Sequence, residues 1–206
     1  MENQKKEKFL NVPNCLSLLR MALIPVYWIL YFNGYAYWAV VTFVVASLTD
    51  LVDGYIARRF NLITKYGKVL DPLADKLMQL SALLSLTITG DVHWLITGLS
   101  LGKELYMIIG GAWLYNKHVV VYSNIFGKTA TMLLSSGLSL ALLAKAFESL
   151  ALTFHGTVML VAQILLIAGT VASLTAGVIY TVSVVKSLKG KISDDKEQNE
   201  KIDLSI

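Results

Sequence analysis

The chain has 206 residues, of which 55% are hydrophobic and only 16% are charged. Soluble domains carry about 25% charged residues, so this composition excludes an ordinary soluble domain and favours a helical membrane protein. Cys15 is the single cysteine, which excludes an intramolecular disulfide. The net charge of +4 does not point to a nucleic acid partner, because the cations gather in a few turns and at the chain ends.

Six apolar segments follow one another along the chain, each close to the roughly 20 residues that cross ~30 Å of hydrocarbon as a helix. They cover residues 16–32, 37–57, 70–89, 94–115, 125–146 and 157–185. Pro13 cannot continue a preceding helix, so Asn14 is predicted to cap the first helix. We therefore predict an all-α integral membrane protein with six transmembrane helices, forming one domain over residues 1–188.

The charged flanks and turns predict which side of the membrane each end occupies. Apart from Lys103 and Lys145, the lysines and arginines lie at the chain ends or near the turns at 58–68 and 116–124. Cations mark the cytoplasmic side, so we predict a multi-pass cell-membrane protein with both termini in the cytoplasm. The basic lead predicts a short interfacial segment, with a solvated flank as the alternative, and no cleaved signal peptide. Residues 189–206 are predicted to form a charged cytoplasmic tail.

Four aspartates mark the turn between the second and third segments. Asp50 and Asp53 lie three residues apart, and Asp71 and Asp75 lie four apart, so each pair shares one helical face. The short connection makes the two helices antiparallel neighbours, which lets the four carboxylates converge near the cytoplasmic side.

Carboxylates inside a membrane are costly, at about 2.5–3.5 kcal/mol for an aspartate at a helix centre, and four together repel one another. Bound divalent cations would compensate this charge, and ligands that are all oxygen favour Mg²⁺, Mn²⁺ or Ca²⁺ over zinc. Four aspartates can hold two ions about 3.5–4 Å apart, as phosphoryl displacement requires. We therefore expect two Mg²⁺ (or Mn²⁺) ions here.

Small residues lie on the same two helical faces, at Gly54, Ala57 and Gly67. They would allow the helices to pack closely, or they would leave room for a flat nucleotide. Their place beside the four aspartates favours the nucleotide.

The spacing D-x2-D-G-x2-A-R-x8-G-x3-D-x3-D, read from Asp50 to Asp75, resembles the signature of the CDP-alcohol phosphatidyltransferases at every fixed position. The stretch NVPNCLSLLR, residues 11–20, is similar to the entry of that family's first helix. The resemblance implies transfer of a phosphatidyl group from CDP-diacylglycerol to an alcohol, with release of CMP. It also implies a homodimer and a site that faces the cytoplasm.

The same resemblance implies roles for individual residues. One metal would be held by Asp50, Asp53 and Asp71, and the second by Asp50, Asp71 and Asp75. Asp75 would also be the general base that takes the proton from the acceptor hydroxyl. The CDP pocket would be lined by Asp50, Asp53, Gly54, Ala57, Arg58, Gly67 and Asp71.

Three cations are candidates for binding an acceptor that carries phosphate. Lys103 lies inside the fourth apolar segment, where an ionised side chain suggests function. The structural alternative is an internal ion pair with Glu104 or a charge in a water-lined position, and the pair is the less favoured because adjacent residues on a helix do not face each other. Lys128 opens the fifth segment and Arg20 lies one turn into the first, although snorkelling to the interface would also explain Lys128.

The acceptor alcohol has to be inferred from residues outside the aspartate motif. Phosphatidylglycerophosphate synthases look similar, with Arg-Glu in place of Lys103-Glu104 and a lysine in place of Ala130. The Ala130 form also resembles cardiolipin synthases that use phosphatidylglycerol. We favour glycerol 3-phosphate because Lys103, Lys128 and Arg20 would together bind a small phosphate; serine and inositol phosphate are weaker alternatives.

The non-enzyme alternative is a divalent-cation transporter, which would also place carboxylates in the membrane. The aspartates lie near one face of the bilayer, however, and no inverted repeat accompanies them.

Gly110, Gly111, Gly169 and Gly177 are predicted to serve helix packing.

Overall fold

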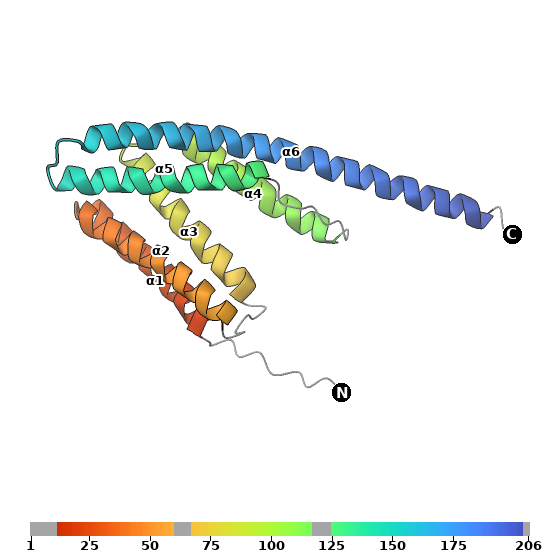
Figure 1. Cartoon of the computed structure of the whole chain (residues 1–206), viewed down its shortest axis with the longest axis horizontal. Helices are drawn as coiled ribbons and strands as arrows, with labels where there is room; N and C mark the ends of the chain where they lie inside the picture. Colours follow the sequence, from red (N-terminus) through yellow and green to blue (C-terminus); the bar gives the residue numbers. More distant parts are fainter. Residues whose placement is uncertain (1–11, 60–66, 117–124, 204–206) are drawn as a thin grey trace. The chain divides into compact units, whose positions relative to one another are not determined.

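The structure of the protein is a computed structural model, and it describes residues 12–59, 67–116 and 125–203. Side chains are described at 14–49, 59, 67, 70–110 and 125–185. Every element within the described ranges is an α-helix (Figure 1). The helices are α1 (Val12–Phe32), α2 (Ala36–Arg59), α3 (Gly67–Ile88), α4 (Trp94–Asn116), α5 (Ile125–Ser149) and α6 (His155–Asp203).

Each of the six predicted apolar segments falls within one of these helices, give or take a residue at its end, which confirms the all-α prediction. Two boundaries differ from expectation. α1 already begins at Val12, so Asn14 lies inside its first turn instead of capping it, because proline is tolerated there. α6 does not end near Val185 but continues as a helix to Asp203.

Three described helices are long and apolar enough to cross a membrane, over Asn14–Phe32 of α1, Ile125–Ser149 of α5 and His155–Val185 of α6. The distribution of polarity fits a lipid surrounding. Large apolar side chains such as Ile29, which is 63% exposed, cover the outside, whereas Arg20 is only 1% exposed. A soluble protein would show the reverse pattern.

The chain forms two compact units. The first contains Met1–His93 and Gly137–Gln163, and the second contains Trp94–Ser136 and Ile164–Ile206.

In the first unit α1 packs against both α2 and α3 (Figure 1). Tyr27 of α1 is fully buried, with its ring centroid 6.4 Å from that of Phe43 on α2. Its hydroxyl forms a 2.6 Å hydrogen bond with Ser85 of α3, and Tyr31 repeats the contact one turn later with Thr89 at 3.1 Å. These two bonds place α1 and α3 parallel and in a defined register.

Three helices of this unit are each followed by a residue with a positive φ angle. Gly34, Gly90 and Ala151 follow α1, α3 and α5 with φ values of 85°, 83° and 56°. After α1, the Tyr35 N–H donates to the Leu30 carbonyl at 2.9 Å, which is the Schellman pattern of a helix end. The left-handed conformation suits glycine, so Ala151 occupies it with strain.

In the second unit α6 packs closely on α5. A Cβ atom on Gly169 would lie 2.8 Å from the Leu134 backbone nitrogen, so the two helices meet where only glycine fits. This confirms a packing role for Gly169. A Cβ atom on Gly110 would meet nothing within 4 Å in the described part of the chain, so no close helix contact within the chain explains this glycine. The surroundings of Gly111 lie outside the described residues.

Candidate active site

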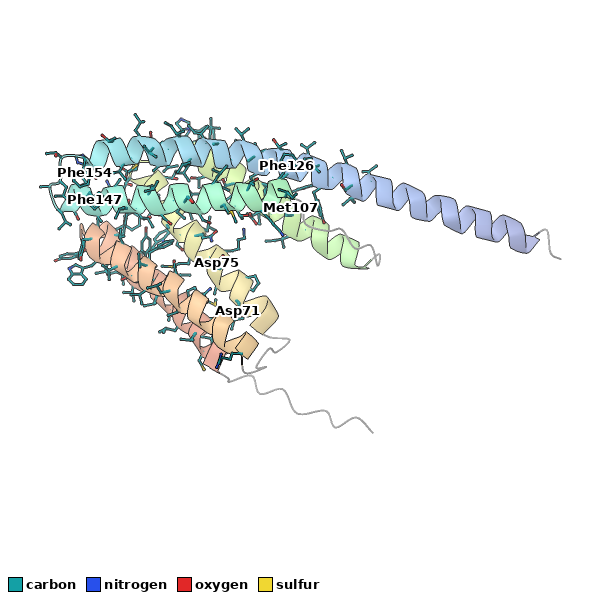
Figure 2. The ribbon with its side chains drawn as sticks, viewed as in Figure 1. Asp71, Asp75, Met107, Phe126, Phe147 and Phe154 are labelled. Carbon is teal, nitrogen blue, oxygen red and sulfur yellow. The ribbon has the colours of Figure 1, made fainter. Side chains whose placement is uncertain are left out.

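Two of the four predicted carboxylates lie in the first turns of α3, on one face, as their four-residue spacing predicts (Figure 2). Asp71 extends the buried stripe of α3 that continues through Ala74 and Met78, which are 0% and 2% exposed. Asp71 and Asp75 are themselves half-buried. Gly67, the first residue of α3, is also buried.

Helix α1 contributes a polar face to the same region of the first unit. Asn14, Ser17 and Arg20 follow one another at three-residue intervals, and each is at most 1% exposed. The Ser17 hydroxyl donates a hydrogen bond to Asp71 Oδ1 and thereby ties α1 to the carboxylate on α3. The acceptor candidate Arg20 therefore lies on the same face as a residue that touches the aspartate motif.

Asp75 has a hydrogen-bond donor from its own helix. Gln79 Nε2 donates to Asp75 Oδ2 at 3.1 Å, across one turn of α3. Each α3 carboxylate thus receives at least one hydrogen bond from a neutral side chain.

The other motif residues belong to α2, which is helical to Arg59. The side chains of Asp50, Asp53, Gly54, Ala57 and Arg58 lie outside the described residues. Among the side chains described, no group of three metal-ligating residues occurs, and two of the four predicted ligands are not in that set. The carboxylate and hydroxyl oxygens around Asp71 do fit a hard cation such as Mg²⁺ or Mn²⁺.

The remaining acceptor candidates belong to the second unit. Lys103 Nζ lies 2.7 Å from Glu104 Oε1, so the ion pair that was the less favoured, structural explanation of this lysine is present. The lysine side chain is long enough to bend sideways along the helix, and its Cγ atom lies 3.9 Å from a Cβ built on Gly177 of α6. Lys128 is exposed near the start of α5.

Sequence reasoning missed Ser17 and Gln79. A signal for Ser17 existed in the three-residue spacing from Asn14 through Ser17 to Arg20, which marks a polar helical face in an apolar segment. Gln79 lies four residues after Asp75, a spacing at which a glutamine and an aspartate can bond on a helix.

Comparison with known proteins adds the family. The sequence model of the CDP-alcohol phosphatidyltransferases matches residues 10–185. The CDP-diacylglycerol–glycerol-3-phosphate 3-phosphatidyltransferase of Aquifex aeolicus is 39% identical over 133 residues, which cover 63% of this chain and 74% of the relative. A probable phosphatidylglycerophosphate synthase of Mycobacterium tuberculosis is 36% identical over 108 residues, which cover 48% of this chain and 51% of the relative.

The family match spans more than half of the chain and includes both the α1 entry and the whole aspartate motif. It confirms the resemblance found in the sequence and makes the chain an enzyme of phospholipid metabolism. The protein belongs to the CDP-alcohol phosphatidyltransferase family.

Proposed function

We propose that this protein transfers the phosphatidyl group of CDP-diacylglycerol to glycerol 3-phosphate and releases CMP. The relatives from Aquifex aeolicus and Bacillus subtilis, the latter 41% identical over 91 residues, are named for that reaction. The observation that carries the proposal is the pair Asp71 and Asp75 on one face of α3, with Ser17 of α1 bonded to Asp71.

The membrane arrangement that we propose has six spans, both termini in the cytoplasm and the active site facing the cytoplasm. Three long apolar helices and the cation-poor turns at Gly34 and Gly90 support this topology. We further propose one catalytic domain over residues 1–188, a charged tail over 189–206, and a homodimer.

The proposed metal site consists of Asp50, Asp53, Asp71 and Asp75, and the family uses a divalent metal. Two Mg²⁺ or Mn²⁺ ions bound there would neutralise the diphosphate of the donor and the charge of the leaving CMP. The oxygen-only ligand set and the half-buried positions of Asp71 and Asp75 support such ions.

The chain's own residues would position the substrates and move one proton. Gly54, Ala57, Arg58 and Gly67 would hold the cytidine end of the donor. Asp75 would accept the proton from the acceptor hydroxyl. The hydroxyl oxygen would then form a bond to the phosphorus of the phosphatidyl group, and the bond from that phosphorus to CMP would break.

The acceptor phosphate would be bound by Lys103, Lys128 and Arg20. The burial of Arg20 on the α1 face that contains Ser17 supports its share in the site. Phosphatidylglycerol is the second candidate acceptor. It is favoured by Ala130, which is 2% exposed and provides no cation where phosphatidylglycerophosphate synthases usually have lysine.

The experiment is CMP release by the purified protein with CDP-diacylglycerol and Mg²⁺, measured separately with glycerol 3-phosphate, phosphatidylglycerol, serine, inositol and inositol phosphate. We expect turnover with glycerol 3-phosphate alone. Turnover with phosphatidylglycerol alone would make the protein a cardiolipin synthase. Metal flux into liposomes without any CMP release would overturn the enzymatic proposal.

A further inference from the structure

The two carboxylates on α3 are each held by a neutral hydrogen-bond donor. Ser17 reaches Asp71 Oδ1 from another helix, and Gln79 reaches Asp75 Oδ2 from one turn along the same helix. Ser17 is completely buried, so its hydroxyl has few other orientations to adopt. Neither side chain belongs to the aspartate motif.

We propose that Ser17 and Gln79 are positioning residues that fix the orientation of the Asp71 and Asp75 carboxylates for metal binding. The inference rests on the proposed function, because it takes these two aspartates as metal ligands. It assigns to α1 a part in orienting a metal ligand, in addition to the acceptor-binding role proposed for Arg20.

The chemistry of the two donors supports this role. A lysine or arginine in either place would neutralise the carboxylate and compete with a divalent cation for its charge. A hydroxyl and an amide carry no positive charge, so they can fix one carboxylate oxygen without themselves neutralising the carboxylate. Outer partners that orient metal ligands in this way typically change metal affinity or activity about 10–100-fold when they are removed.

A purely structural explanation would treat the Ser17 bond as one more tie between α1 and α3. Tyr27 provides the matched control, because its hydroxyl joins the same two helices through Ser85 and touches no carboxylate. Tyr27→Phe therefore loosens the helix pair without altering a metal ligand.

The test is Mn²⁺ binding to the purified full-length protein in detergent micelles, followed by the electron paramagnetic resonance signal of free Mn²⁺. Ser17→Ala and Gln79→Met should each bind Mn²⁺ about 10–100-fold more weakly than the wild type. Ser17→Thr, which keeps the hydroxyl, and Tyr27→Phe should bind like the wild type. In CMP release, Ser17→Ala should need more Mg²⁺ for half-maximal rate and regain the rate at high Mg²⁺.

Two results would overturn the inference alone. One is wild-type affinity in Ser17→Ala and Gln79→Met while Asp71→Asn loses binding. The other is an equal loss in Ser17→Ala and Tyr27→Phe, which would assign the effect to helix packing. If Asp71→Asn binds Mn²⁺ as the wild type does, the proposed metal site fails and the inference fails with it. Gln79→Met tests the inference if Ser17→Ala does not fold, because Gln79 bonds within α3.

Discussion

Lys145 of α5 forms a 3.2 Å ion pair with Asp91, which lies 54 residues earlier in the turn after α3. The ammonium also lies 2.6 Å from Glu148, and the Gln163 amide of α6 donates to the Asp91 backbone carbonyl at 2.8 Å. This cluster explains why a lysine occurs in a turn region that the charge pattern places on the cation-poor side. It joins the end of α3 to α5 and α6 within the first unit.

Replacing Lys145 with methionine should lower the stability of the protein. Lys145 and Asp91 are only 17% and 18% exposed, so the substitution leaves two carboxylates without their shared cation. We expect a loss of about 1–3 kcal/mol, measured by thermal unfolding in detergent.

The double variant Lys145→Met/Asp91→Asn is the matched control, since it removes the unpaired charge together with its partner. It should lose less than the sum of the two single variants, with a coupling of about 0.5–3 kcal/mol. Strict additivity would show that the pair contributes nothing to stability.

Replacing a glycine by alanine should change the stability of the protein in opposite directions at two positions of the second unit, Gly169 and Gly98. Gly169→Ala places a Cβ 2.8 Å from the Leu134 nitrogen, and a backbone atom cannot move aside cheaply. We expect a loss of about 1–3 kcal/mol from overpacking. Gly98→Ala in α4 meets nothing within 4 Å and should gain about 0.5–1 kcal/mol. Equal midpoints of thermal unfolding in the two variants would contradict this packing.

The helices were predictable because the length of an apolar run and its flanking polar turns determine where a membrane helix lies. The spacing of Asp71 and Asp75 likewise fixed their common face in advance. The extension of α6 to Asp203 was not predictable from hydropathy, because a charged helix beyond Val185 has no apolar signal.

Contacts between helices were beyond the reach of the sequence. No sequence pattern predicts that Ser17 contacts Asp71, because the register of α1 against α3 is set by tertiary packing such as the Tyr27–Ser85 hydrogen bond. The Cβ directions alone gave too little weight to the pairing of Lys103 with Glu104. The rule that adjacent residues do not face each other neglects how far a four-carbon side chain can bend.

That ion pair gives a test of the acceptor site. If Lys103 binds the acceptor phosphate, Lys103→Ala should raise the apparent KM for glycerol 3-phosphate about tenfold or more, because a hydrogen bond to a charged group contributes about 1.5–3 kcal/mol. Glu104→Gln is the comparison, since it removes the competing carboxylate 2.7 Å from the ammonium and should not raise KM. An unchanged KM in Lys103→Ala would remove this residue from the acceptor site.

The strongest test of the proposed chemistry is Asp75→Asn. The substitution keeps the size of the side chain, and Gln79 can still donate to the remaining carbonyl oxygen, so the fold should be retained. The amide cannot accept a proton from the acceptor hydroxyl and binds a cation weakly. Loss of a general base alone costs about 10²–10⁴-fold in rate, and we expect at least that loss of CMP release. Raising the Mg²⁺ concentration separates the two roles of Asp75. A ligand-only role predicts recovery of the rate at high Mg²⁺, whereas a base role predicts that the rate stays low, which is the result we expect.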